Sequence, residues 1–210
     1  MLSRFVALPV SLTLTVSQFQ VWHCSGQSNM WLPVSSAFAH NDTLKNITVD
    51  KKYHNIRLMA GNSGDCPGTG PTTGNSGPMP ASCPWMTTTE AAIMPPKRGR
   101  GPQPVPPLFN FGAACWYFAQ KLSDELEAAG KLVPIGVTDT AIGGQRIEEY
   151  MVNDTSLTAC SERTGETSPE WNGRLYGKQT LPFVDMSIKG WLWYRKMVDA
   201  FPIWSRLPSR

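Results

Sequence analysis

The chain has 210 residues, of which 41% are hydrophobic and 17% are charged. This balance is typical of a globular domain and excludes a disordered chain. The formal net charge of +3 is small, and no arginine-rich or aromatic-basic stripe accompanies it, which argues against a nucleic-acid partner. No run of about 18 apolar residues occurs, so we expect no integral membrane segment.

The first 17 residues have two interpretations. Residues 1–4 followed by the apolar residues 5–16 resemble a short signal peptide, although Ser11, Thr13 and Thr15 dilute the apolar stretch. The alternative is that they are strand and loop residues at the start of a trimmed gene model. We therefore expect residues 1–17 to be a signal peptide or a poorly ordered leader.

Cysteines and glycosylation acceptor triplets favour a secreted or lysosomal protein. The five cysteines show no spacing typical of a metal site; they are Cys24, Cys66, Cys83, Cys115 and Cys160. Cys66 and Cys83 are close enough in sequence to close a disulfide loop, and free thiols are the alternative. Three Asn-X-Thr triplets begin at Asn41, Asn46 and Asn153, and each alone is a weak signal.

The first half of the chain predicts two strands and a long irregular insert. Residues 18–24 alternate polar and apolar side chains and end at Ser25-Gly26, which predicts a strand and a turn. Residues 55–60 predict a second short strand. Residues 61–107 hold much of the excess glycine and proline and show no sustained periodicity, so we expect irregular structure there.

The second half alternates helices and strands. Residues 111–129 predict a helix with one apolar face, which Gly130 ends. Residues 132–138 predict a buried strand, and the Gly143-Gly144 turn leads into a short helix over residues 145–151. Residues 161–172 predict a loop, residues 175–184 a helix, and residues 188–194 another buried strand.

This order of elements indicates a doubly wound α/β sheet. Ligands bind at the carboxyl ends of the strands in such sheets. Ser28 and the Gly143-Gly144 turn both follow predicted strands, so we expect both at that edge.

Ser28 is a candidate nucleophile. Gly26 allows a tight turn before it, which would expose the hydroxyl for attack on an acyl carbon, and backbone N–H groups of the turn could stabilise the oxyanion. A serine that caps a helix is the commoner role after a loop, and spacing alone favours that role.

Several blocks in order resemble the sialate O-acetylesterases, a group of carbohydrate esterases of the SGNH-hydrolase type. The Gly-Gln-Ser-Asn-Met string of residues 26–30 is specific to that group. Residues 111–119, residues 134–148 and residues 175–194 are similar to its later blocks. The similarity covers residues 19–194 and is poor in the Gly/Pro-rich middle, so we expect one domain over residues 18–194 with an irregular insert at about 61–107.

The resemblance implies a three-layer α/β/α fold with a mostly parallel, flavodoxin-like sheet. It implies that Ser28 is the nucleophile and that backbone groups of Ser28, Gly144 and Gly143 form the oxyanion hole, while Gln27 and Asn29 shape the substrate site. The implied substrate is an acetylated sugar or sialic acid, and the implied reaction needs no metal or organic cofactor.

Two departures from the family pattern concern activity. The similarity stops after Tyr194, and residues 195–210 form a divergent tail in place of a Gln-Gly-Glu-type segment. No histidine follows His54, whereas the family's catalytic histidine lies near the C-terminus. We therefore expect a truncated domain that lacks the last elements of the fold. Its alternative function is a catalytically inactive fragment, at most a carbohydrate-binding module.

Overall fold

The computed structural model describes residues 19–60, 85–95, 105–164 and 171–194. In this part of the chain, no helix has both the length and the apolar character needed to cross a membrane. Five strands form one sheet in the order β3-β2-β4-β1-β5. They are β1 (Gln20–Gly26), β2 (Ile56–Ala60), β3 (Met86–Thr87), β4 (Ile135–Asp139) and β5 (Gly190–Tyr194). Four of these strands run parallel and β3 pairs antiparallel with β2, which confirms the mostly parallel sheet.

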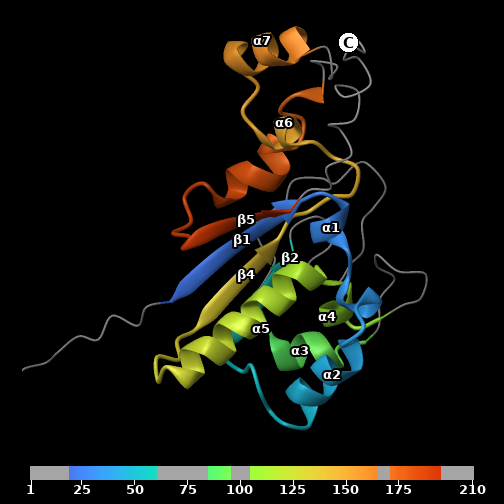
Figure 1. The fold of residues 1–210 in the computed structure, drawn as a ribbon, viewed down its shortest axis with the longest axis vertical. Helices are drawn as coiled ribbons and strands as arrows, with labels where there is room; N and C mark the ends of the chain where they lie inside the picture. The colour runs from blue at the N-terminus through green and yellow to red at the C-terminus, as the bar shows by residue number, and fades with distance from the viewer. Residues whose placement is uncertain (1–18, 61–84, 96–104, 165–170, 195–210) are drawn as a thin grey trace, which may run out of the picture.

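Helical segments lie on both faces of the sheet, so the expected three-layer α/β fold is also confirmed (Figure 1). Because side chains alternate along β1, Trp22 faces Phe118 of one helical layer, whereas His23 faces Phe183 of the other. The helices are α1 (Ser28–Trp31), α2 (His40–Thr48), α3 (Thr88–Ile93), α4 (Pro107–Asn110), α5 (Ala113–Ala128), α6 (Ile147–Tyr150) and α7 (Thr155–Thr164). A 3₁₀ turn covers Val34–Ser36, and a π-helical turn, Tyr176–Thr180, precedes the 3₁₀ turn Leu181–Phe183.

The helix predicted over residues 111–129 is α5, but its buried face is rotated from the one expected. Trp116, Ala119 and Ser123 are buried, whereas Phe118 and Leu122 are only partly so. The buried face thus combines the large Trp116 ring with the small residues Ala119 and Ser123, and the Ser123 hydroxyl bonds Asn55 at 3.1 Å.

Three local expectations were wrong. Residues 86–93, placed in the irregular insert, form β3 and α3, and the Thr87 hydroxyl caps α3 in a reciprocal bond pair with Glu90. The predicted loop at 161–172 begins within α7. β5, expected to be buried, lies at the edge of the described sheet, with Trp191 42% and Tyr194 51% exposed.

A disulfide joins Cys24 of β1 to Cys115 of α5 across 91 residues. Both cysteines are fully buried, so the bond lies inside the core between the sheet and α5. Sequence analysis did not predict this pair, because the two cysteines lie in different predicted elements. Cys66 and Cys83, for which a disulfide was considered, lie outside the described residues, as does the 1–17 leader.

Candidate active site

Ser28 lies where the sequence predicts, directly beyond the carboxyl end of β1. The turn depends on Gly26, whose φ of +141° and close approach to Tyr194 exclude a side chain: an added Cβ would lie 2.4 Å from the Tyr194 carbonyl oxygen. Gln27 donates its N–H to that same oxygen at 3.1 Å. The chain then turns into α1, whose first residue, Ser28, is exposed.

The short helix α1 holds the turn at Ser28 in place. Met30 is buried beneath it, and the Met30 and Trp31 N–H groups bond the Gln27 carbonyl oxygen at 3.0 and 2.9 Å. Gln27 and Asn29 flank Ser28 and are half-buried. No described residue hydrogen-bonds to the Ser28 hydroxyl, so it is not a helix-capping group in this part of the chain.

The Gly143-Gly144 turn follows β4, the neighbour of β1, and the loop before it is joined to the turn that precedes Ser28 by hydrogen bonds. Ile142 donates its N–H to the Gly26 carbonyl at 3.2 Å, and Tyr150 donates its hydroxyl to the same oxygen at 3.3 Å. Burial raises the pKa of Tyr150 well above its ordinary value, so this hydroxyl remains a donor.

Gly144 itself is exposed, has a φ of +82°, and has open space around its Cα. Gly143 lies against α1, because an added Cβ would lie 3.9 Å from the Trp31 ring. The structure therefore brings Gly143 and the helix that Ser28 begins together at one sheet edge.

Asp139, the last residue of β4, was missed by sequence analysis. Its buried carboxylate accepts the Gly112 N–H at 2.9 Å and the Ala141 N–H at 3.1 Å, which joins the start of α5 to the loop before Gly143. An added Cβ at Gly112 would lie 2.6 Å from the Met30 carbonyl oxygen. An acidic residue at the end of an apolar strand is the signal that could have revealed this position.

His23 is a structural residue, as its place in a strand suggested. Its ring is fully buried, with Nδ1 2.7 Å from Thr138 Oγ1 and Nε2 3.2 Å from Thr140 Oγ1. The rings of Phe183 and Trp191 each lie 4.4 Å from it. This burial lowers the pKa of His23 to about 4, so the ring is neutral near pH 7.

Neither of the other two histidines is placed as a base for Ser28. His54 precedes β2, and Ile56 stands level with Gln20, at the opposite end of β1 from Gly26. At a rise of about 3.3 Å per residue, roughly 20 Å of strand separates these two levels. His40 begins α2, where its Nδ1 lies 2.7 Å from the Ala37 carbonyl and its ring faces Phe109.

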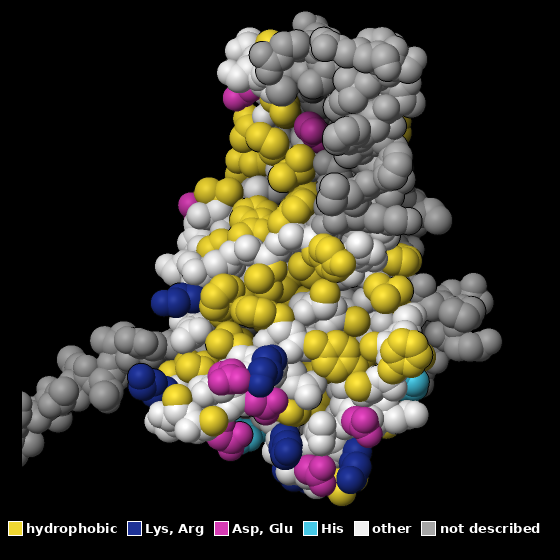
Figure 2. All heavy atoms as spheres, viewed as in Figure 1, with side chains coloured by type: hydrophobic (Ala, Val, Ile, Leu, Met, Phe, Trp, Pro, Cys, Tyr) yellow, Lys and Arg dark blue, Asp and Glu magenta, His cyan; other side chains and the backbone are white. Residues whose placement is uncertain are grey.

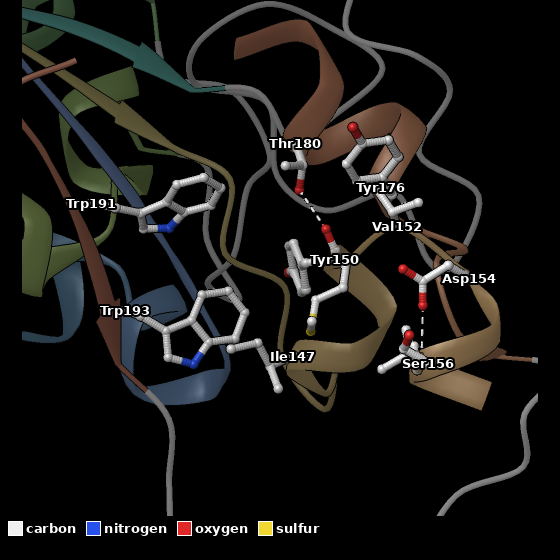
Figure 3. Close-up of a pocket in the computed structure, with 11 residues that line it drawn as sticks. Ile147, Tyr150, Val152, Asp154, Ser156, Tyr176, Thr180, Trp191 and Trp193 are labelled. Carbon is white, nitrogen blue, oxygen red and sulfur yellow. Dashed lines mark hydrogen bonds between the residues drawn. The ribbon is translucent and has the colours of Figure 1, made fainter. Parts of the chain in front are cut away.

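Two cavities adjoin this region. One, of about 320 Å³, is lined by Gly144, Gln145, Arg146, Glu149, Trp171 and Arg174. The other, of about 750 Å³, is walled mostly by apolar side chains, with Trp191 and Trp193 on one side and Tyr150 and Tyr176 opposite (Figure 3). Ser28 lines neither cavity, but Gly144 opens directly into the smaller one.

The charged and apolar surfaces are separated on the face shown in Figure 2. Most lysine, arginine and acidic side chains on this face lie at the lower end, whereas apolar side chains cover much of the described surface in the middle and above it. The exposed apolar residues of the C-terminal third include Met151, Val152, Trp191 and Tyr194. The surface around β5 is thus more apolar than the end of the domain that holds α2 and α3.

Two curated proteins match most of the chain. It is 27% identical over 186 residues to the sialate O-acetylesterase of Pongo abelii and 26% identical to that of Homo sapiens. Each alignment covers 83% of this chain and 30% of the relative, so the chain spans about a third of their length. No protein-family model matches the chain.

A solved structure shares the fold. The chain superposes on a carbohydrate acetylesterase from Xanthomonas citri with a TM-score of 0.51 and 20% identity, over 84% of this chain and 32% of that one. The chain is thus similar in sequence to sialate O-acetylesterases over most of its length, and similar in fold to a carbohydrate acetylesterase.

Proposed function

We propose that this chain is a carbohydrate O-acetylesterase that uses Ser28 as its nucleophile. Ser28 Oγ attacks the acetyl carbonyl of an acetylated sugar, the sugar hydroxyl leaves, and water then releases acetate from the acetyl-serine. The observation that supports this proposal best is the exposed Ser28 at the carboxyl end of β1, beside the turn that follows β4.

Backbone geometry supports an oxyanion hole at the same edge. The first N–H groups of a helix have no intrahelical acceptor, and Ser28 is the first residue of α1. Among the described residues no acceptor takes the Gly144 N–H, and the absence of a side chain there leaves room for a substrate carbonyl. Donors of Ser28 and Gly144, with Gly143 beside them, would stabilise the tetrahedral intermediate.

No histidine of the chain is placed to act as the general base for Ser28. All three histidines of the chain are accounted for, and none hydrogen-bonds to Ser28. Loss of the base from a serine triad lowers the rate by several orders of magnitude, and a residual rate remains from the oxyanion hole and binding. We therefore expect slow hydrolysis that rises with pH and has no inflection near pH 6.5, the ordinary pKa of histidine.

The substrate class is proposed from the relatives, whose names specify sialate O-acetylesterase and carbohydrate acetylesterase activities. An acetyl ester on a sialic acid or a related sugar is therefore the substrate to test first. The proposed chemistry uses backbone donors, a serine and water.

The test is acetate release from O-acetylated sialic acid and from 4-nitrophenyl acetate by the purified chain and its Ser28→Ala variant. We expect release by the wild type to exceed that of Ser28→Ala by at least about tenfold. Ser36→Ala, which changes a serine in the 3₁₀ turn after α1, is the matched control and should retain wild-type activity. Equal rates for the wild type and Ser28→Ala would exclude Ser28 as the nucleophile.

The second candidate function is sugar binding without hydrolysis. It is favoured by one specific observation, the placement of all three histidines away from Ser28. Binding of the deacetylated sugar with no Ser28-dependent acetate release would support this candidate over the esterase.

We also propose that the protein is made in the secretory pathway and is secreted or lysosomal. A buried disulfide is typical of oxidising compartments, and the acceptor residues Asn41 and Asn153 are both exposed. A mobility shift after enzymatic removal of N-glycans from the cell-expressed protein would support this location, and free Cys24 in that protein would contradict it.

A further inference from the structure

The smaller cavity beside Gly144 carries an excess of positive charge. Its lining includes two guanidinium groups, Arg146 and Arg174, and one carboxylate, Glu149. Two positive charges against one negative charge leave one positive charge on the lining. The cavity adjoins the proposed oxyanion turn, so a charged group held here would belong to the same substrate as the reacting ester.

The buried Glu149 carboxylate forms ion pairs with both arginines. Its side chain is 3% exposed, and its Oε1 accepts the Arg146 backbone N–H at 3.0 Å and lies 3.6 Å from Arg146 Nε. Its Oε2 accepts a bond from Arg174 Nε. A buried carboxylate needs such partners; here Glu149 hydrogen-bonds one edge of the Arg174 guanidinium and forms a longer ion pair with Arg146.

Arg174 is held on two further sides. One of its terminal nitrogens donates to Gln145 Oε1, and its guanidinium carbon lies over the Trp171 ring, 4.1 Å from the centroid. Gln145 is itself oriented by a bond to the Gly143 carbonyl at 3.3 Å. This arrangement fixes the Arg174 plane before any ligand arrives, which lowers the entropy cost of binding.

Both arginines line the cavity and retain N–H donors that no described residue uses. A guanidinium group has five N–H donors, and the bonds to Glu149 and Gln145 use two of those on Arg174. No described residue accepts a hydrogen bond from the terminal nitrogens of Arg146. Arginine is the side chain best suited to bind a carboxylate with two parallel bonds.

We propose that Arg146 and Arg174 form a subsite that binds the carboxylate of an acidic sugar, either a sialic acid or a uronic acid. This inference rests on the proposed function for the ester end of the substrate, and it adds that the enzyme selects sugars by charge. The backbone donors at Gly144 would receive the acetyl oxygen, while Arg146 and Arg174 hold the carboxylate on the other side of the turn.

The test separates the carboxylate from the ester. Equilibrium binding to the Ser28→Ala variant is measured for N-acetylneuraminic acid and for glucuronic acid, each beside its methyl ester, which removes only the negative charge. We expect one of the acids to bind about 10- to 100-fold more tightly than its methyl ester, the range given by charge-assisted hydrogen bonds. The acid that shows this preference identifies the sugar class.

Variants then test whether Arg146 and Arg174 supply the positive charge that binds the carboxylate. In the Ser28→Ala background, Arg174→Gln and Arg146→Gln should each reduce the preference for the acid, and Arg174→Lys should restore part of it. Lys121→Gln removes the same charge from the exposed face of α5, where Lys121 pairs with Glu125, and should leave the preference intact. Since Arg174 also supports Glu149, the thermal unfolding of each variant is measured in parallel.

Equal binding of the acids and their methyl esters by the unmutated pocket would overturn the proposal, and this comparison needs no arginine variant to fold. A preference for the acid that survives both arginine changes would also overturn it. Preference for the acid without any Ser28-dependent acetate release would uphold the subsite while the esterase proposal fails.

Discussion

The disulfide between Cys24 and Cys115 allows a stability prediction with a magnitude. It closes a loop of 91 residues, for which the chain-entropy relation gives about 4.6 kcal/mol at 25 °C. Measured values usually fall below this relation, so we expect reduction to lower the free energy of unfolding by about 2–5 kcal/mol. For a chain of this size, that corresponds to a fall in Tm of roughly 4–20 °C.

The experiment uses a Cys66→Ala/Cys83→Ala background, because Cys24, Cys115 and Cys160 are then the remaining cysteines. Reduction by a small thiol breaks the cross-link without removing its sulfur atoms, so no cavity complicates the comparison. Urea unfolding is followed by tryptophan fluorescence with and without the reductant. A Cys24→Ala/Cys115→Ala variant in the same background should be unaffected by the reductant.

Oxidised and reduced forms that unfold within about 0.5 kcal/mol of each other would refute this argument, since loop closure predicts a far larger difference. Alkylation of Cys24 or Cys115 in the native, unreduced protein would refute the pairing itself.

His23 and Gly112 provide two further predictions. Because the pKa of His23 falls from 6.5 to about 4 on folding, its contribution to stability is complete above pH 6.5 and is lost as the pH falls through about 4. This amounts to about 3 kcal/mol, which a pH series of unfolding curves for the wild type and His23→Gln will measure; parallel curves would contradict it. Gly112→Ala should destabilise the fold by about 1–3 kcal/mol, because its Cβ would lie 2.6 Å from the Met30 carbonyl. Gly177→Ala, where nothing lies within 4 Å, is the control, and an equal loss in both variants would show that the close contact is not the cause.

Elements with strong periodicity were predictable from the sequence. β1, β2 and α5 lie close to the predicted residues, because alternation and a single apolar face are local properties. β3 and α3 were missed, since a two-residue strand and a six-residue helix between Gly/Pro-rich segments leave too few residues to show a period. The exposure of β5 could not be predicted either, because a strand's neighbours are a property of the whole sheet.

The candidate site was predictable in part. Ser28 and Gly143-Gly144 follow strands, and the parallel arrangement brings their turns to one edge. Glu149 and Arg174 escaped notice, because their contact joins residues 25 positions apart and no spacing rule connects them. The fixed pairing of Cys24 with Cys115 likewise depends on where α5 crosses β1.

The bond from Gln27 to the Tyr194 carbonyl has a consequence for biosynthesis. The turn at Ser28 is completed by a strand that is translated more than 160 residues after it. A nascent chain that ends after α5 holds the Ser28 turn residues and both cysteines of the core disulfide, but lacks the strand that shapes the turn. Oxidation of Cys24 and Cys115 can therefore precede completion of the Ser28 turn during translation.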